Sequence, residues 1–242
     1  TYARSAYTNS RKAIGIGDQK PAAHVDLDFW QGPAPLRDDV SKYVHYDWHW
    51  KWHWGGGELA NNGPHGLDIV RWGLGVDYAL QVSCTGGRYH FDDEQETPDS
   101  FVAAYDFGHC GAAWDGSSCN PRAFDKPAFV EFYGEGGSLA ISGGNGYSLY
   151  DLKGKEMEKK SEPGSDVPHF QNFLDSIRGL AKSNSEIEEG QKSTLLCHLG
   201  NIAWRTGRTI HFDPKTKKIV GDDEAVKLYW SRTYREGWEP KV

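Results

Sequence analysis

The feature of this sequence that most constrains its fold is a run of strand-length segments separated by glycine turns. The run spans residues 128–160 and reads AFVEFYGEGGSLAISGGNGYSLYDLKGKEMEKK, with glycines at 134–137, 143–146 and 154. Glycine turns between short segments rich in aromatic and β-branched residues are typical of β-hairpins. We therefore expect a meander of antiparallel strands that forms part of a larger sheet.

Other segments extend this sheet and add helices to it. Further strands are expected at 1–8 and 80–91, and in a hairpin of 101–107 with 112–118. Helical apolar spacing follows at 169–182 and 185–208, after which a polar tail begins. The sequence thus predicts an α+β fold, a large open, predominantly antiparallel sheet with helices on one face. Residues 1–242 suffice for a single domain of this kind.

An aromatic segment, YVHYDWHWKWHWGGG at residues 43–57, alternates large rings with polar side chains. A period of two predicts a β-strand, because successive side chains then point to opposite faces. Its polar face would carry His49, Lys51 and His53. Such a strand could be structural, could form a wall for a sugar-like ligand, or could give two histidine ligands to a metal. Nothing nearby completes a metal motif, so we predict no metal site.

Charge and hydropathy exclude several classes of partner. The formal net charge is −7 and there is no basic run, so we expect no binding to nucleic acid. No apolar stretch approaches the roughly 20 residues that a membrane-spanning helix needs. Cys110 and Cys119 flank a glycine-rich turn and suit a disulfide or a reduced pair equally, so the sequence leaves the cellular compartment open.

Nucleotide-binding motifs are missing from the sequence. The Gly15-Ile-Gly17 pair has Lys20 where a third glycine would complete a dinucleotide-binding turn, and no helical pattern follows it. There is also no P-loop and no Gly-x-Ser-x-Gly motif. The chain starts without methionine and directly with a strand-like segment, so we expect it to be cut from a longer protein.

The segment ANNGPHGLD, residues 60–68, is the best candidate for a reactive site. His65 stands at the predicted start of a short helix that ends near Gly73–Gly75. The helix N-terminus disfavours an imidazolium, so His65 should tend toward the neutral form that accepts a proton. Asp68 is an expected orienting partner for His65 or serves the first turn of the helix itself. Asn61 and Asn62 are placed to bond a substrate hydroxyl or to form the turn.

The segment GGGELANNGPHGLDIVRWGLG, residues 55–75, resembles the Gly-Gly-Gly…Asp-x-Gly-x-His-x-x-Asp segment of the Gfo/Idh/MocA oxidoreductases. FWQGPAP, VEFYGEGGSLAI and EIEEGQKSTLLCHLGNIAWRTGR extend the similarity over nearly the whole chain. It covers only the C-terminal half of that family, an open sheet that supplies substrate contacts and the subunit interface. The resemblance therefore implies an N-terminal Rossmann domain, absent from this chain, that mainly holds the cofactor, NAD or NADP.

The resemblance also implies roles for particular residues. His65 matches the family histidine that exchanges the proton of the oxidised hydroxyl, while Asn61 replaces a carboxylate found in many members. Asn cannot relay a proton as Asp can. The aromatic strand would lead to the substrate cleft and present the polar residues of its face to it. Further candidate substrate-binding residues are Trp30, in a proline-rich loop, and Arg11 and Lys12.

The function expected from these observations is that of the substrate and oligomerisation domain of an oxidoreductase acting on a sugar or cyclitol hydroxyl. The chain alone would be inactive. An alternative within the same family is an NAD-recycling glycosidase, and an alternative of another class is a non-catalytic carbohydrate-binding or assembly module. An open sheet needs a cover, so we expect a homo-oligomer that forms through the sheet.

Overall fold

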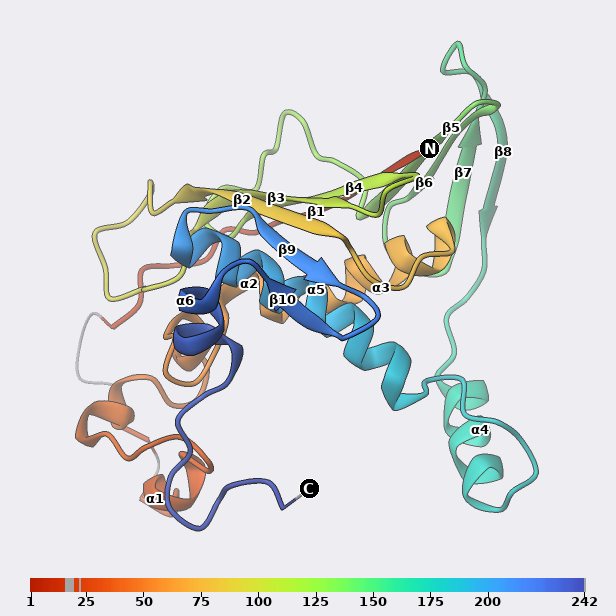
Figure 1. Ribbon diagram of the computed structural model, residues 1–242. Helices are drawn as coiled ribbons and strands as arrows, with labels where there is room; N and C mark the ends of the chain where they lie inside the picture. Colours follow the sequence, from red (N-terminus) through yellow and green to blue (C-terminus); the bar gives the residue numbers. More distant parts are fainter. Residues whose placement is uncertain (16–19, 22, 242) are drawn as a thin grey trace.

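A single sheet of ten strands organises residues 1–15, 20–21 and 23–241, which the computed structural model describes (Figure 1). The Gly15-Ile-Gly17 pair extends beyond these residues. The strands are β1 (Tyr2–Thr8), β2 (Gln81–Gly87), β3 (Ser100–Asp106), β4 (Gly111–Ser117), β5 (Val130–Gly134), β6 (Gly137–Ile141), β7 (Gly146–Tyr150), β8 (Glu156–Ser161), β9 (Ile210–Asp213) and β10 (Lys218–Val220).

The strand order is β10-β9-β2-β3-β4-β1-β5-β6-β7-β8, with β1 near the middle. β1 runs parallel to β4, with Tyr2 opposite Gly111, and antiparallel to β5, with Tyr2 opposite Tyr133. The other pairs of the described sheet are antiparallel. The predicted hairpin of β3 with β4 and the predicted meander β5–β8 are both confirmed, as is the predominantly antiparallel sheet.

Side chains alternate along the central strands between a covered face and an open one. On β3, Phe101, Ala103 and Tyr105 are buried, whereas Val102 and Ala104 between them are exposed. This alternation is that of an antiparallel sheet with one face in the core. The exposed side chains of Val102 and Ala104 therefore mark the open face of the sheet at β3.

Helices cover one face of the sheet, as predicted (Figure 1). They are α2 (Gly57–Asn61), α3 (Gly63–Leu74) and α5 (Ile187–Thr206). α5 ends at Gly207, which adopts the left-handed conformation that closes a helix. The core between these helices and the strands includes Leu67, Val70, Val82, Trp114, Leu196, Leu199 and Ile202.

Two glycines allow the helices to lie close to their neighbours. A Cβ atom on Gly66 of α3 would lie 2.1 Å from the Ser5 hydroxyl on β1. A Cβ atom on Gly200 of α5 would lie 2.6 Å from Leu59 on α2. Any side chain at either position would separate packed elements, so these glycines set the distance between the elements that meet there.

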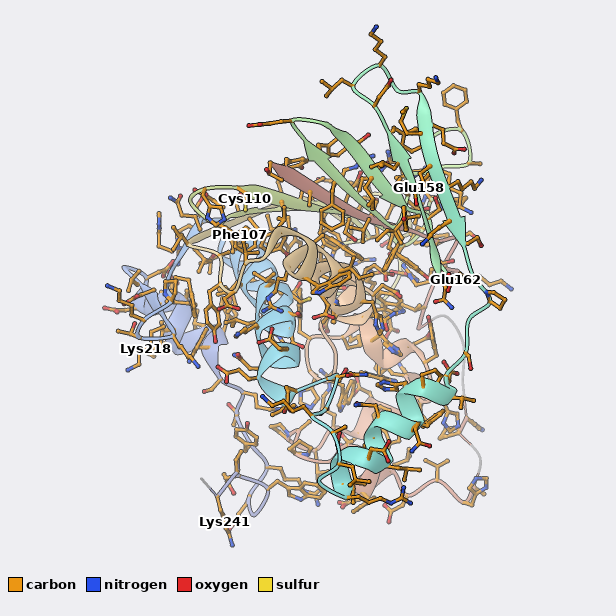
Figure 2. The ribbon with its side chains drawn as sticks, turned by 90° about the vertical axis from the view of Figure 1, so that its right-hand side faces the viewer. Phe107, Cys110, Glu158, Glu162, Lys218 and Lys241 are labelled. Carbon is orange, nitrogen blue, oxygen red and sulfur yellow. The ribbon has the colours of Figure 1, made fainter. Side chains whose placement is uncertain are left out.

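α4 (Val167–Ile177) confirms the helix predicted around residues 169–182, but it stands apart from the layered body. Figures 1 and 2 show it beyond the end of β8, past Glu158 and Glu162, on connections that hold it away from the sheet. None of its residues is buried. Its apolar side chains, Val167, Phe170, Phe173, Leu174 and Ile177, are all exposed.

The prediction of a polar tail after residue 208 is wrong. Residues 210–220 form β9 and β10, which extend the sheet beyond β2, and α6 (Asp223–Ala225) and the π-helical turn η3 (Val226–Trp230) follow. Ile210, Phe212 and Ile219 are buried, and these strands are too short for their alternation to stand out in the sequence. Within the described residues, no helix is both long and apolar enough to cross a membrane.

Candidate active site

The junction between α2 and α3 places the predicted reactive residues together. Asn62 follows α2 and precedes α3, and His65 lies in the first turn of α3. Pro64 shares this turn, where the amide that proline lacks has no helical partner in any case. The His65 side chain is exposed.

The path of the chain into this junction requires a glycine. Gly57 begins α2 with a φ of +66°, a conformation that residues with a side chain rarely adopt. A Cβ atom there would also lie 2.6 Å from the Thr97 side chain. The last glycine of the Gly-Gly-Gly run thus packs α2 against the loop that carries Thr97, which fixes the position of the residues that follow.

Glu58 is a residue of this junction that the sequence analysis missed. Its side chain is only 1% exposed, and the Asn62 amide donates a hydrogen bond to it over 2.5 Å. Burial raises the pKa of Glu58 to about 7, while the bond from Asn62 and the positive charge of Arg11 act in the opposite direction. The signal in the sequence was the spacing of four residues between a carboxylate and an amide, which brings them together on a helix.

Tyr7 connects the junction to the end of β1. Its side chain is half-buried, and Glu58 acts on it electrostatically. Burial is the largest influence on the Tyr7 hydroxyl and raises its pKa, whereas a hydrogen bond with Asn62 lowers it. Tyr7, Glu58 and Asn62 therefore form one connected polar group beside the turn that carries His65.

Asp68, the expected partner of His65, is bonded elsewhere. It accepts a hydrogen bond from the Ser193 hydroxyl on α5 over 2.6 Å and lies 3.8 Å from the Arg71 guanidinium. Asp68, about one turn after His65 on α3, thus faces α5 and links the two helices. The prediction that it orients the imidazole of His65 is not supported by these contacts.

The prediction that residues 43–57 form a β-strand is wrong. The segment folds into turns and a short 3₁₀ helix, η2 (Asp47–Trp50). The Trp48 indole donates to the His45 carbonyl, and the rings of Trp48 and His49 stack at 3.9 Å. These contacts between near neighbours replace the hydrogen-bond ladder of a strand, so the two-residue alternation of the sequence does not correspond to a pleat.

The polar residues of this segment do not form a common face. His49 bonds through Nδ1 to the Tyr46 carbonyl over 2.5 Å, and His53 bonds through Nε2 to the Pro35 carbonyl over 2.7 Å. Lys51 is buried, forms an ion pair with Glu96 at 2.6 Å and donates to the Glu94 carbonyl. The predicted polar wall made of His49, Lys51 and His53 is therefore not present in this arrangement.

The three weaker candidates differ in their surroundings. Trp30 ends a short helix, α1 (Leu27–Trp30), where we expected a loop, and its ring meets Trp48 and Trp54 edge-on at 6.4 and 6.0 Å. Lys12 is exposed. Arg11, in contrast, has its side chain packed inside the protein.

The Arg11 guanidinium holds together the loops beside the junction. It lies 5.2 Å from the Trp50 ring and 5.7 Å from the Phe91 ring. It also pairs with Asp93 at 3.4 Å and donates to the side chain of Gln95. With its side chain 6% exposed, this arginine has the contacts of a buried structural cation, and these contacts do not favour the predicted binding role.

The thiols and the potential metal ligands form no disulfide and no cluster among the described residues. All four cysteines are free thiols, which excludes in this structure the disulfide considered for Cys110 and Cys119. Among residues 1–15, 20–21 and 23–241, no group of three histidine, cysteine or carboxylate side chains is arranged to hold a metal ion.

Comparison with known families identifies the domain. Residues 12–240 match the family described as "Oxidoreductase family, C-terminal alpha/beta domain", which belongs to the Gfo/Idh/MocA oxidoreductases. The chain is a member of this family. The match includes the α2–α3 junction with His65, so the resemblance noted in the sequence is confirmed. No curated protein matches the chain.

Solved structures share the fold of this Gfo/Idh/MocA domain. The protein YvaA of Bacillus subtilis has a TM-score of 0.58 at 17% identity, over 88% of this chain and 58% of that one. The aldose-aldose oxidoreductase of Caulobacter crescentus, complexed with glycerol, has 0.57 at 15% identity, over 87% and 55%. The WlbA dehydrogenase of Bordetella pertussis, in complex with NADH and UDP-GlcNAcA, has 0.51 at 17% identity, over 88% and 54%. The chain thus spans little more than half the length of each.

Proposed function

We propose that this chain is the substrate-binding and oligomerisation domain of an NAD- or NADP-dependent oxidoreductase that acts on a hydroxyl of a sugar or cyclitol. The observation that carries the proposal is the exposed His65 at the start of α3, next to Asn61 and Asn62, in a member of an oxidoreductase family. An imidazole with two neutral amides beside it suits a substrate with several hydroxyl groups.

The chemistry assigned to this chain is the handling of one proton and of the hydroxyl groups. A bound nicotinamide would supply the acceptor for the hydride of the carbinol carbon. His65 takes the proton of the hydroxyl as the carbonyl forms, because an imidazole nitrogen can act as a general base. Asn61 and Asn62 bond neighbouring hydroxyls and orient the substrate. These residues supply the substrate side of the reaction, and the dinucleotide would be held mainly by a Rossmann domain that precedes this chain.

The exposed apolar side of α4 fits a packing partner, which in the proposed arrangement is the preceding domain. A helix of 11 residues is marginally stable alone in water, and helices of this kind are usually stabilised by packing of their apolar face. Phe170 and Phe173 are more than half exposed in this chain. In the longer protein, backbone amides of α4 should be protected from hydrogen exchange to the same degree as those of α5. Rapid exchange throughout α4 would argue against a domain packed there.

The open face of the sheet supports the proposed homo-oligomer. It carries the stacked rings of Tyr2 and Tyr133, with centroids 6.1 Å apart, beside an ion pair of Arg4 with Glu131 at 2.7 Å. Exposed Val102 lies on the same open face, on β3. A homo-oligomer in light scattering, reduced to monomers by V102D, is the expected result. A monomer of the wild-type protein would contradict the proposal.

The experiment that tests the main proposal starts from the longer protein, produced from its natural start. It is denatured, and the released nucleotide is identified by absorbance and mass. A stoichiometric nicotinamide dinucleotide, followed by formation of NADH or NADPH with sugars or cyclitols, supports the proposal. If no nucleotide is released and none is taken up when offered, the better assignment is a non-catalytic carbohydrate-binding or assembly module.

Asn61 favours a second candidate function within the same family. An amide in the place of the carboxylate of many members cannot relay a proton out of the site. Transient oxidation that permits cleavage of a glycosidic bond, with the dinucleotide returned to its starting state, makes less use of such a relay. Release of an aglycone without net formation of NADH would distinguish this reaction from a net oxidation.

A further inference from the structure

The Glu58 carboxylate is a buried titratable group that the proposed proton transfer does not use. It lies on α2 with 1% of its surface exposed, four residues before Asn62. The bond to Glu58 Oε1 is donated by Nδ2 of Asn62. An ionised carboxylate can only accept hydrogen bonds, so it requires the nitrogen of the amide, and not the oxygen, to face it.

This requirement determines which atom of the Asn62 amide faces away from Glu58. Its NH₂ group faces Glu58, and the hydrogen bond between Asn62 and Tyr7 lowers the pKa of the Tyr7 hydroxyl, as a bond donated by the same NH₂ group does. The carbonyl oxygen, Oδ1, is then directed away from the carboxylate. No hydrogen bond to Oδ1 is found within the described part of the chain. The α2–α3 junction thus offers an acceptor next to the turn of His65.

We propose that Glu58 is a positioning residue that fixes the orientation of the Asn62 amide, so that Asn62 Oδ1 accepts a hydrogen bond from a substrate hydroxyl. The inference deepens the proposed function and rests on it for the identity of the hydroxyl. Glu58 itself does not touch the substrate, because it is buried behind Asn62. A site built with such an oriented acceptor selects for a hydroxyl at that position and against an analogue without one.

The arrangement depends on the charge of Glu58. When Glu58 is protonated, its O–H can donate to Oδ1, so the carboxyl group no longer favours one orientation of the Asn62 amide. The pKa of about 7, raised mainly by burial, places this change near neutral pH. Arg11 is the charged group that acts on Glu58, and Tyr7 is the neighbouring hydroxyl on β1. Asn201 on α5, which donates to the carbonyl of Gly56, is uncharged.

Nuclear magnetic resonance of the side-chain amide of Asn62 tests the proposal without substrate or nucleotide. The chain is labelled with ¹⁵N-asparagine, and the Asn62 resonances are assigned from their loss in N62S. Between about pH 5.5 and 8.5, the wild-type resonances should shift with a midpoint near the Glu58 pKa of about 7. E58Q, which keeps the shape but cannot ionise, should abolish the transition. E162Q, a change of an exposed glutamate beyond β8, should leave it intact.

The outcomes separate this inference from the proposed function. Resonances of Asn62 that do not move in the wild-type protein, or that move equally in E58Q, overturn the inference even if the longer protein is an active dehydrogenase. A titration that E58Q removes upholds the positioning role even if no sugar is oxidised. In an active enzyme, E58Q should raise KM about tenfold above pH 7, as expected for the loss of one hydrogen bond. A fall in kcat with unchanged KM would contradict the role in binding.

Discussion

Asp68 on α3 accepts a hydrogen bond from the Ser193 hydroxyl on α5 over 2.6 Å. The same hydroxyl also accepts from Arg71, whose guanidinium is buried between the two helices. The carboxylate that stands three residues after His65 in the sequence thus serves the packing of α3 on α5. Asp68 should therefore contribute to the stability of the domain and not to the reactivity of His65. Substitutions at the two positions can test this.

Replacement of Asp68 should affect stability, whereas replacement of His65 should affect turnover. D68A should lower the free energy of unfolding by about 1 kcal/mol, the usual value of one hydrogen bond, with turnover largely kept. H65A should leave stability nearly unchanged, because the side chain is exposed, and should reduce kcat of the longer protein at least about 100-fold. Urea denaturation and steady-state kinetics measure the two quantities. Full activity of H65A would remove the histidine from the proposed mechanism.

Acid should destabilise the domain through Glu189. Its pKa is lowered to about 2, first by the hydrogen bond from Lys192 and then by the one from Arg71. A carboxyl whose pKa is lower in the folded than in the unfolded state stabilises the fold above its ordinary pKa of 4.5, and this contribution is lost as pH falls toward 2. The side chain is 53% exposed, so solvent weakens the effect.

The measurement is the melting temperature between about pH 6 and pH 2.5 for the wild-type protein and E189Q. The wild-type protein should lose more stability over this range than the variant, and the two curves should converge at the acid end. E239Q, near the C-terminus and exposed, is the matched control and should follow the wild-type curve. Parallel curves for wild type and E189Q would show that the network around Arg71 does not hold Glu189 ionised.

The sequence predicted those parts of the fold that depend on regular patterns over a long segment. Glycine turns located the strands of the β5–β8 meander, and the apolar spacing of Leu195, Leu196 and Leu199 located α5. The aromatic segment misled the prediction, because its alternation has the period of a strand although neighbouring rings such as Trp48 and His49 stack on each other within turns. Local hydrogen bonds from side chains to the backbone compete with a strand and are invisible in a pattern of polarity.

The candidate site was predictable only in part for a related reason. The position of His65 at a helix start follows from Pro64 and from the glycines before it. The internal position of Arg11 depends on Trp50, Phe91 and Asp93, which come from distant parts of the chain. Tertiary packing of this kind decides whether a charged residue binds a ligand or supports the fold, and no local motif records it.

Glycines in the two packed helices allow a last prediction with opposite signs. G66A should destabilise the domain, because the new methyl group would lie 2.1 Å from Ser5 Oγ and 3.0 Å from the Trp114 ring. Overpacking of this kind costs about 1–3 kcal/mol, since β1 or α3 must move. Gly190 lies in α5 in ordinary helical backbone, and a methyl group added there would meet no atom within 4 Å. G190A should therefore stabilise the domain by about 0.5–1 kcal/mol.

Chemical denaturation of the two alanine variants measures this contrast directly. Both substitutions add the same methyl group to a helix and favour helical backbone equally, so the difference between them reports the space between α3 and the sheet at Gly66. The two free energies of unfolding should differ by about 1.5–4 kcal/mol in favour of G190A. Equal stability of the two variants would mean that α3 does not lie against β1 as closely as Gly66 permits, and with it the placement of the His65 turn beside β1 would be wrong.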